Sequence, residues 1–210
     1  MLAHVVGNLP GKTRPGEYVL FSAHWDHLGR CKPDATGDDI CNGAVDNATG
    51  VAALQIIFNI FRQKPIHTLF AEAKQRQVAL LVRLPLASGL LGGKMTQETT
   101  FPANDHRNFN RDGQQFNVGE TFAGLPFEKG VELADALKEF VPVGMTMAQM
   151  TLRWILDHDA VSVIIPGASS PAQATGNAAA AGLEKLPAEL HAKIAEFYQT
   201  QVAQHIRGPY

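Results

Sequence analysis

The chain has 210 residues, of which 45% are hydrophobic and 18% charged, with 19 glycines and 12 prolines. This composition fits a globular protein of one or two domains and excludes collagen-like, coiled-coil and disordered classes. A formal net charge of −2 argues against a nucleic-acid partner held by phosphate contacts, and the apolar runs are far shorter than the roughly 18 residues of a membrane span. With two cysteines and no signal-like start, we expect a cytoplasmic protein.

The N-terminal quarter predicts one strand and one helix start. Residues 17–23 (EYVLFSA) predict a strand that is entered through a Pro-Gly turn. A polar loop rich in Asp and Gly follows over 24–43. Asp46 or Asn47 then predicts the N-cap of a helix.

From residue 54 onward, predicted strands and helices alternate. We predict strands over 54–60, 78–83 and 161–165, and helices over 65–76, 127–140, 146–157, 171–181 and 187–203. The segment 92–124 has no convincing period, and a loop of that length is usually functional or disordered. The alternation predicts parallel βα units, whose ligand sites lie at the carboxyl ends of the strands.

The predicted fold class is therefore α/β, as a partial (β/α) barrel or an open parallel sheet of about four strands with flanking helices. Closing a barrel of this type takes roughly eight strands. An open sheet has two exposed edges and one uncovered face. Either the chain folds as an open three-layer sheet, or a second copy covers that face in a homo-oligomer.

The N-terminal segment carries a candidate zinc site at His24 and Asp46. His24 and Asp26 share one side of an extended chain, and a carboxylate can orient a zinc-bound imidazole. An N-cap aspartate beside a loop histidine is the alternative interpretation. SAHWDHLG (22–29) followed by NGAVDNATGVA (42–52) resembles the dizinc aminopeptidases. The resemblance implies that His24 and Asp46 are zinc ligands and that Asp26 is the orienting, catalytic residue of a hydrolase. The Glu-Glu motif of that family, which supplies the general base, has no match, so we expect at most one weakly bound zinc ion.

Three motifs further along resemble the aldo-keto reductases. LQIIFNIFRQKP (54–65), RLPLASGLLGGK (83–94) and IIPGASSPAQATGN (164–177) match the last three βα units of that family's TIM barrel in order and spacing. Independently, Ser170 followed by Pro171 predicts a capped helix start, and a helix N-terminus binds anions.

The resemblance implies that NADP(H) is the cofactor and assigns a role to each matching residue. Gly167, Ala168 and Ser169 would line the 2′-phosphate pocket, and Gln173 and Asn177 would reach the adenine. Gln55 would contact the nicotinamide carboxamide, and Arg83 takes the place of an aromatic residue that stacks on the nicotinamide ring. Four residues would lie near the pyrophosphate: Leu84, Leu86, Ser88 and Gly89. The alternative interpretation is that these residues are only scaffold strands and caps.

The catalytic tetrad of the family, an Asp, a Tyr, a Lys and a His, has no match. None of Tyr18, Tyr198 and Tyr210 occupies the tyrosine motif, and losing the proton donor slows reduction by about 10²–10⁴-fold. We therefore expect an NADP(H)-binding oxidoreductase fragment that is weak or inactive. A zinc-dependent hydrolase and a recombined or designed chimera without chemistry are the alternatives.

The two resemblances meet within residues 50–55 without a polar linker, which is unusual for a natural domain fusion. The predicted domains are a metallopeptidase-like fragment, 1–53, and a reductase-like barrel half, 54–210.

Overall fold

The computed structural model describes residues 2–10, 18–26 and 53–208. The chain divides into two compact units, Met1–Gly50 and Val51–Tyr210, and each is described by itself. In the first unit, β1 (Leu2–Pro10) pairs antiparallel with β2 (Tyr18–Asp26). The strand predicted over 17–23 is therefore present, but it pairs with the antiparallel β1. The helix start predicted at Asp46 or Asn47 lies outside the described residues.

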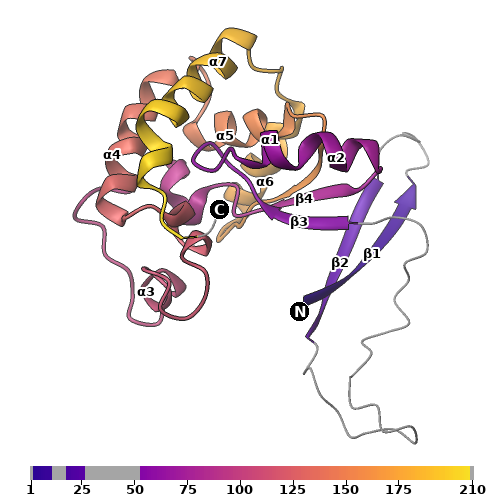
Figure 1. Cartoon of the computed structure of the whole chain (residues 1–210), viewed down its shortest axis with the longest axis horizontal. Helices are drawn as coiled ribbons and strands as arrows, with labels where there is room; N and C mark the ends of the chain where they lie inside the picture. The colour runs from indigo at the N-terminus through magenta and orange to yellow at the C-terminus, as the bar shows by residue number, and fades with distance from the viewer. Residues whose placement is uncertain (1, 11–17, 27–52, 209–210) are drawn as a thin grey trace, which may run out of the picture. The chain divides into compact units, whose positions relative to one another are not determined.

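The second unit is built on a parallel sheet (Figure 1). Its strands β3 (Ala53–Ile57), β4 (Ala79–Arg83) and β5 (Val161–Ile165) lie in the order β3-β4-β5, and both pairings are parallel. The predicted α/β class with a parallel sheet and flanking helices is confirmed. This sheet has three described strands, whereas the sequence predicts about four, because β2 pairs elsewhere.

One residue interrupts the pairing of β4 with β5. Leu80 pairs with Val161 and Leu81 pairs with Val163, so that Ser162 is an extra residue on β5. The Ser162 hydroxyl accepts a hydrogen bond from the Leu80 backbone N–H at 3.2 Å. This is a β-bulge, in which a side-chain oxygen accepts the hydrogen bond of a backbone N–H group at the interruption.

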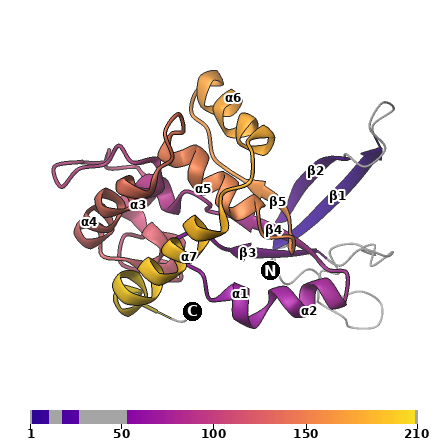
Figure 2. The ribbon, with the colours of Figure 1, turned by 90° about the horizontal axis from the view of Figure 1, so that it is seen from above.

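The helices follow the predicted pattern closely (Figure 2). The longer ones are α4 (Phe127–Leu137), α5 (Met147–Leu156), α6 (Pro171–Ala179) and α7 (Ala188–Phe197). The single helix predicted over 65–76 is instead two short ones, α1 (Pro65–Thr68) and α2 (Phe70–Gln75), because Leu69 between them leaves helical geometry at φ −135°. A capping box at Thr146 and Gln149 starts α5: the Thr146 Oγ1 accepts from the Gln149 N–H, and the Gln149 Oε1 accepts from the Thr146 N–H.

The two faces of the parallel sheet differ because side chains alternate along a strand. Leu80 and Val82 belong to the main hydrophobic core together with Trp154 of α5 and Phe70 of α2. Phe58, just beyond β3, contacts both aromatic rings, with centroid distances of 5.1 Å to Trp154 and 4.9 Å to Phe70. By alternation, the opposite face carries Gln55, Leu81 and Arg83.

Candidate functional site

The carboxyl ends of the three parallel strands meet in one row. Ile57 pairs with Arg83, and Arg83 pairs with Ile165. Gln55 lies two residues before the end of β3, on the same face of the sheet as Arg83. The predicted cofactor residues thus lie on these strands or in the segments that follow them, at the edge where parallel α/β sheets bind ligands.

The segment after β4 has an unusual backbone. Leu84, Ala87 and Ser88 have φ angles of 53°, 48° and 57°, in the left-handed region that residues other than glycine rarely adopt. Two long-range hydrogen bonds hold this conformation: the Asn59 Nδ2 donates to the Leu84 carbonyl at 3.0 Å, and the Phe122 N–H donates to the Ser88 Oγ at 3.2 Å. Such strain costs roughly 1–3 kcal/mol per residue and concentrates at functional sites.

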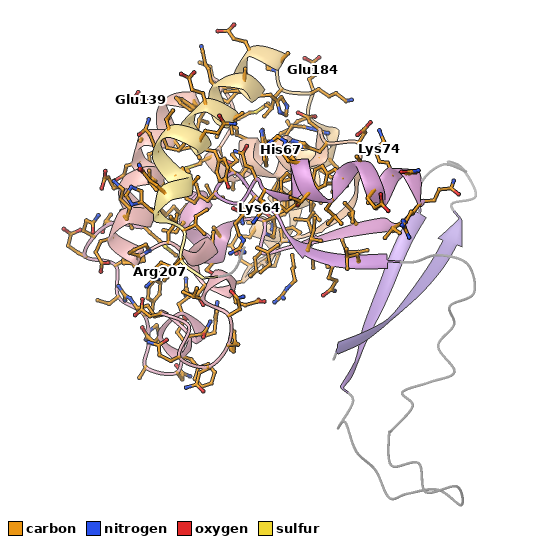
Figure 3. The ribbon with its side chains drawn as sticks, in the orientation of Figure 1. Lys64, His67, Lys74, Glu139, Glu184 and Arg207 are labelled. Atoms are coloured by element: carbon orange, nitrogen blue, oxygen red, sulfur yellow. The ribbon has the colours of Figure 1, made fainter. Side chains whose placement is uncertain are left out.

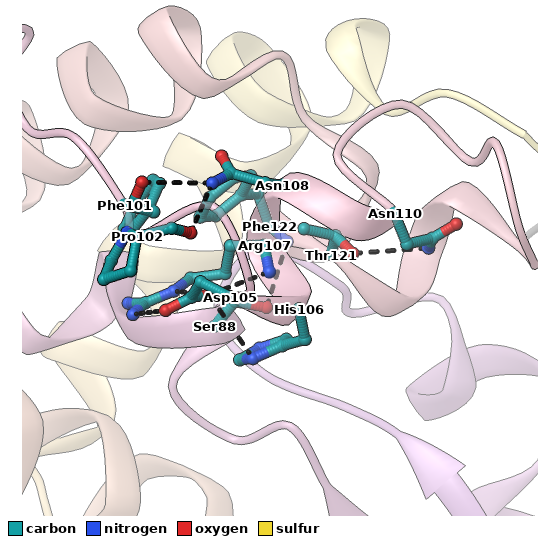
Figure 4. Close-up of polar contacts among 10 residues, drawn as sticks. All are labelled: Ser88, Phe101, Pro102, Asp105, His106, Arg107, Asn108, Asn110, Thr121 and Phe122. Atoms are coloured by element: carbon teal, nitrogen blue, oxygen red, sulfur yellow. Dashed lines mark hydrogen bonds and ion pairs between the residues drawn. The ribbon is translucent and has the colours of Figure 1, made fainter.

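The segment 92–124, which has no sequence period, is ordered around one buried asparagine. Asn110 is fully buried, and its Oδ1 accepts from the N–H groups of Gln115 and Phe116 at 3.1 and 3.0 Å. Its Nδ2 donates to the Asn117 carbonyl and to the Thr121 Oγ1, both at 3.3 Å, and Figure 4 shows the contact with Thr121. One side chain therefore ties together residues 115–121, which bend back toward the strand ends.

A second polar cluster fixes α3 (His106–Phe109) within the same segment. Asp105 caps the helix by accepting from the Arg107 N–H at 2.9 Å, and it also pairs with the Arg107 guanidinium at 2.6 and 2.8 Å (Figure 4). These hydrogen bonds hold the pKa of the Asp105 carboxyl well below its usual range. The guanidinium in turn lies over the Phe101 ring, 4.2 Å from its centroid. Asp105 is therefore a structural anion.

Arg83, the last residue of β4, forms a two-point ion pair with Glu120. Its Nη1 lies 2.9 Å from the Glu120 Oε1, and its Nη2 lies 2.5 Å from the Oε2. The side chains are 39% and 20% exposed, so the pair lies at the surface of the site. A parallel arrangement of this kind fixes the guanidinium plane.

The segment after β5 leads into the N-terminus of α6. Ser170 is the N-cap, since its Oγ accepts from the Gln173 N–H at 3.2 Å, and Pro171 follows it. The Gln173 Oε1 accepts from the Ser169 N–H at 2.7 Å and from its hydroxyl at 2.9 Å. Asn177 donates to the Gly167 carbonyl at 3.1 Å. The side chains of Gln173 and Asn177 therefore shape the loop that precedes their own helix.

The residues after β5 fit an anionic group of a nucleotide. Gly167, Ala168 and Ser169 are exposed, and a Cβ atom at Gly167 would meet nothing within 4 Å. Open space therefore adjoins the capped N-terminus of α6, a helix of nine residues whose dipole favours an anion at this end. The residues present are compatible with phosphate binding.

Two hollows in the described surface lie away from the carboxyl ends of the strands. One of about 410 Å³ is lined by residues that include Tyr198, Lys64 and His67, the last two of which Figure 3 labels. Another of about 260 Å³ lies between the end of α2 and the start of β5. Neither of these two hollows is lined by a residue of the predicted cofactor set.

Of the residues predicted for the zinc site, His24 and Asp26 lie on β2 and Asp46 lies outside the described residues. Among the residues described, no group of three or more His, Cys, Asp or Glu side chains is placed to hold a metal ion. No described helix is long and apolar enough to cross a membrane.

A model of the Aldo/keto reductase family matches residues 38–199. The chain belongs to this family. The aldo-keto reductase YhdN of Bacillus subtilis (strain 168) is 30% identical over 132 residues, which cover 61% of this chain and 38% of that protein. This second comparison supports the same assignment.

A solved structure shows the same fold. The glycerol dehydrogenase AKR11B4 from Gluconobacter oxydans matches with a TM-score of 0.57 at 24% identity, over 75% of this chain and 44% of that one. The holo form of the aldo-keto reductase AKR11C1 from Bacillus halodurans gives a TM-score of 0.48 at 21% identity, over 71% of this chain and 43% of that one. The chain thus spans less than half the length of these relatives.

The comparisons confirm the resemblance to aldo-keto reductases and give no support to the metallopeptidase, zinc or chimera interpretations. The family match begins at residue 38 and includes Asp46, which the metallopeptidase resemblance assigns to a different family. The short motif around His24 therefore predicts more chemistry than the comparisons support.

Three residues that shape the site do not stand out in the sequence as site residues: Asn59, Asn110 and Glu120. Asn59 lies within the apolar run predicted as a strand over 54–60, and a polar residue at that position could have been selected. Asn110 and Glu120 lie in the segment without a period. The partners of Asn110 are 5 to 11 residues further along that segment, whereas nothing local indicates that the partner of Glu120 is as distant as Arg83.

Proposed function

We propose that this chain binds NADP(H) across the carboxyl ends of β3, β4 and β5. The nicotinamide end would lie near Gln55 and Arg83, and the 2′-phosphate near Gly167, Ala168 and Ser169. The main support is the pairing row Ile57–Arg83–Ile165, which brings three separate motifs to one edge of the sheet. Residues 54–210 are the proposed nucleotide-binding part.

Each remaining cofactor residue has a proposed place along the nucleotide. Leu84, Leu86, Ser88 and Gly89 follow β4 and would flank the pyrophosphate, where the left-handed backbone turns carbonyl and N–H groups away from strand geometry. Gln173 and Asn177 would contact the adenine through the side-chain polar atoms that do not bond the loop before α6. When bound, the cofactor supplies a hydride, and the chain's own residues bind and orient it.

We further propose that this chain alone reduces carbonyl compounds slowly. Its tyrosines do not match the family's proton-donor motif, and a missing general acid costs about 10²–10⁴-fold in rate. This protein should therefore bind the nucleotide but turn over carbonyl substrates only slowly.

Thermal stability measured with added nucleotide tests the binding proposal. A ligand that binds only the folded state raises the melting temperature, so NADPH should raise it and zinc should not. NADPH should act at lower concentration than NADH, since only NADPH carries the 2′-phosphate. A folded chain that responds to neither nucleotide would contradict the proposal.

A charge introduced at Ser169 locates the 2′-phosphate. Ser169→Asp should weaken NADPH binding about tenfold or more while changing NADH binding little, because only NADPH places a phosphate beside the new carboxylate. Ala192→Asp, at an exposed position on α7, adds the same charge elsewhere and should change neither. If Ser169→Asp weakened the binding of both nucleotides equally, the 2′-phosphate would not bind at this loop.

We also propose that a second copy covers the open face of the parallel sheet together with its exposed edges. The outer strands β3 and β5 each carry a large hydrophobic residue, Leu54 and Ile165, that is 42% exposed. Sedimentation should show concentration-dependent dimers, and Leu54→Lys with Ile165→Lys should give monomers. A monomer at all concentrations would contradict this part of the proposal.

A further inference from the structure

The ion pair of Arg83 and Glu120 places two opposite charges at the end of the central strand. The four atoms of the contact lie within 2.9 Å of their partners, and both side chains remain partly exposed. The pair has no net charge, but each member has a strong field at short range.

Glu120 is held firmly enough to act as a fixed charge. It ends a short 3-10 turn, Val118–Glu120, which Asn117 caps by accepting from the Gly119 N–H at 2.7 Å. Gly119 is buried against Arg62, and a Cβ atom at Gly119 would clash with the Arg62 Nη1. Only glycine therefore allows the turn to sit this close, and the turn sets the position of the carboxylate.

The two oxidation states of a nicotinamide differ in charge. The oxidised ring is a cation and the reduced ring is neutral, whereas the phosphates are the same in both. A bare guanidinium beside the ring repels only the oxidised form, and a carboxylate beside it attracts only that form. The ratio of the affinities for the oxidised and the reduced nucleotide therefore depends on the charge beside the ring. Effects on the phosphates or on folding change both affinities alike and cancel in this ratio.

We propose that the Arg83–Glu120 pair sets the relative affinity of this chain for NADP⁺ and NADPH. Glu120 is the specificity-determining residue that offsets the repulsion between Arg83 and the oxidised ring. This inference rests on the proposed function, because it requires the nicotinamide to lie at the carboxyl end of β4.

A charge-neutralising cycle tests the inference by equilibrium binding of the two nucleotides to the full chain. Glu120→Gln leaves Arg83 uncompensated and should weaken NADP⁺ relative to NADPH by about three- to tenfold. Arg83→Gln leaves Glu120 uncompensated and should shift the ratio in the opposite direction. The double variant should return the ratio close to that of the unmodified chain, and both single shifts should shrink at high salt.

Glu128→Gln is the matched control. Glu128 pairs with Arg111 through one contact of 3.0 Å at an exposed position, away from the strand ends, so its loss should leave the ratio unchanged. If Glu120 had only a structural role, Glu120→Gln would weaken the binding of both nucleotides equally. Arg83→Gln would then not shift the affinity ratio in the opposite direction.

The possible failures are distinguishable. If the unmodified chain binds neither nucleotide, the proposed function fails. If it binds both but the two single variants change the ratio in the same direction or not at all, the inference fails and the proposed function stands.

Discussion

The loops after β4 and β5 occupy equivalent places at the sheet edge but are built differently. The loop after β4 has left-handed residues and is tied to partners far away in sequence, such as Asn59 and Phe122. The hydrogen bonds of the loop after β5 join it to its own helix, and α6 contains no buried residue. One loop depends on the core, whereas the other depends on local chemistry.

This difference divides the proposed site into a rigid and an adaptable part. The nicotinamide end would meet a surface fixed by tertiary contacts, which suits a ring that must be oriented for hydride transfer. The adenosine end would meet a surface helix whose polar side chains can exchange one partner for another. Stability should therefore depend on the first loop, and nucleotide choice should be adjustable in the second.

The largest expected effect compares Asn110, in the segment that Phe122 joins to the loop after β4, with Asn177, which holds the loop after β5. Asn110→Ala removes a buried side chain with four hydrogen bonds and should lower the free energy of unfolding by about 3 kcal/mol. Asn177→Ala removes one contact, to the Gly167 carbonyl, and should cost well under about 1 kcal/mol. Denaturant unfolding measures both, and equal losses would contradict the division.

The next effect concerns the cap of α6. Ser170→Ala removes the acceptor for the Gln173 N–H and should cost about 1 kcal/mol, whereas Ser170→Gly should cost only a few tenths because glycine is itself a tolerated cap. The same denaturant series gives the values. If alanine and glycine behave alike, the hydroxyl does not hold the loop after β5.

A smaller change in the opposite direction is expected at Gly176. This glycine lies inside α6, and an added Cβ would meet nothing within 4 Å. Gly176→Ala should therefore stabilise the chain by roughly 0.5–1 kcal/mol through helix propensity. Gly130→Ala in α4 is the contrasting case, because its Cβ would lie 2.6 Å from the Leu90 Cδ1. Destabilisation by Gly176→Ala would show that another group packs against this side of α6 in solution.

The smallest expected effect is a dependence on pH at the amino-terminal side of β5, away from both loops. Burial lowers the pKa of the His158 imidazole, which packs against Trp154 with a centroid distance of 4.6 Å. The unfolded chain then binds a proton more readily, so stability should fall as the pH drops below about 6.5. Melting temperatures between pH 8 and pH 5 should show this decline, and His158→Gln should reduce it. An unchanged slope in that variant would assign the decline to other groups.

Local signals predicted the strands and helices of the second unit well. The exact match at Val161–Ile165 follows from an apolar run bounded by turn residues, and Ser170 was predicted as the cap of α6 from the residues around it. Pairing was harder, because nothing within residues 17–23 shows that their partner is an antiparallel strand at 2–10. The same limit applies to the site: Ser170 acts on its neighbours and could be predicted, whereas Glu120 acts on Arg83 across the fold and could not.

The extra residue at Ser162 sets the phase of the last strand. Side chains alternate every residue, so the two-for-one step opposite Leu80 and Leu81 reverses the parity of everything that follows on β5. With the insertion, Val163 and Ile165 are level with Leu81 and Arg83. If β5 continued in regular alternation without the bulge, Val163 would be level with Val82, and Val163 and Ile165 would face the core in place of Ile164. The bulge therefore decides which side chains in the carboxyl half of β5 face the core and which share the side of Arg83.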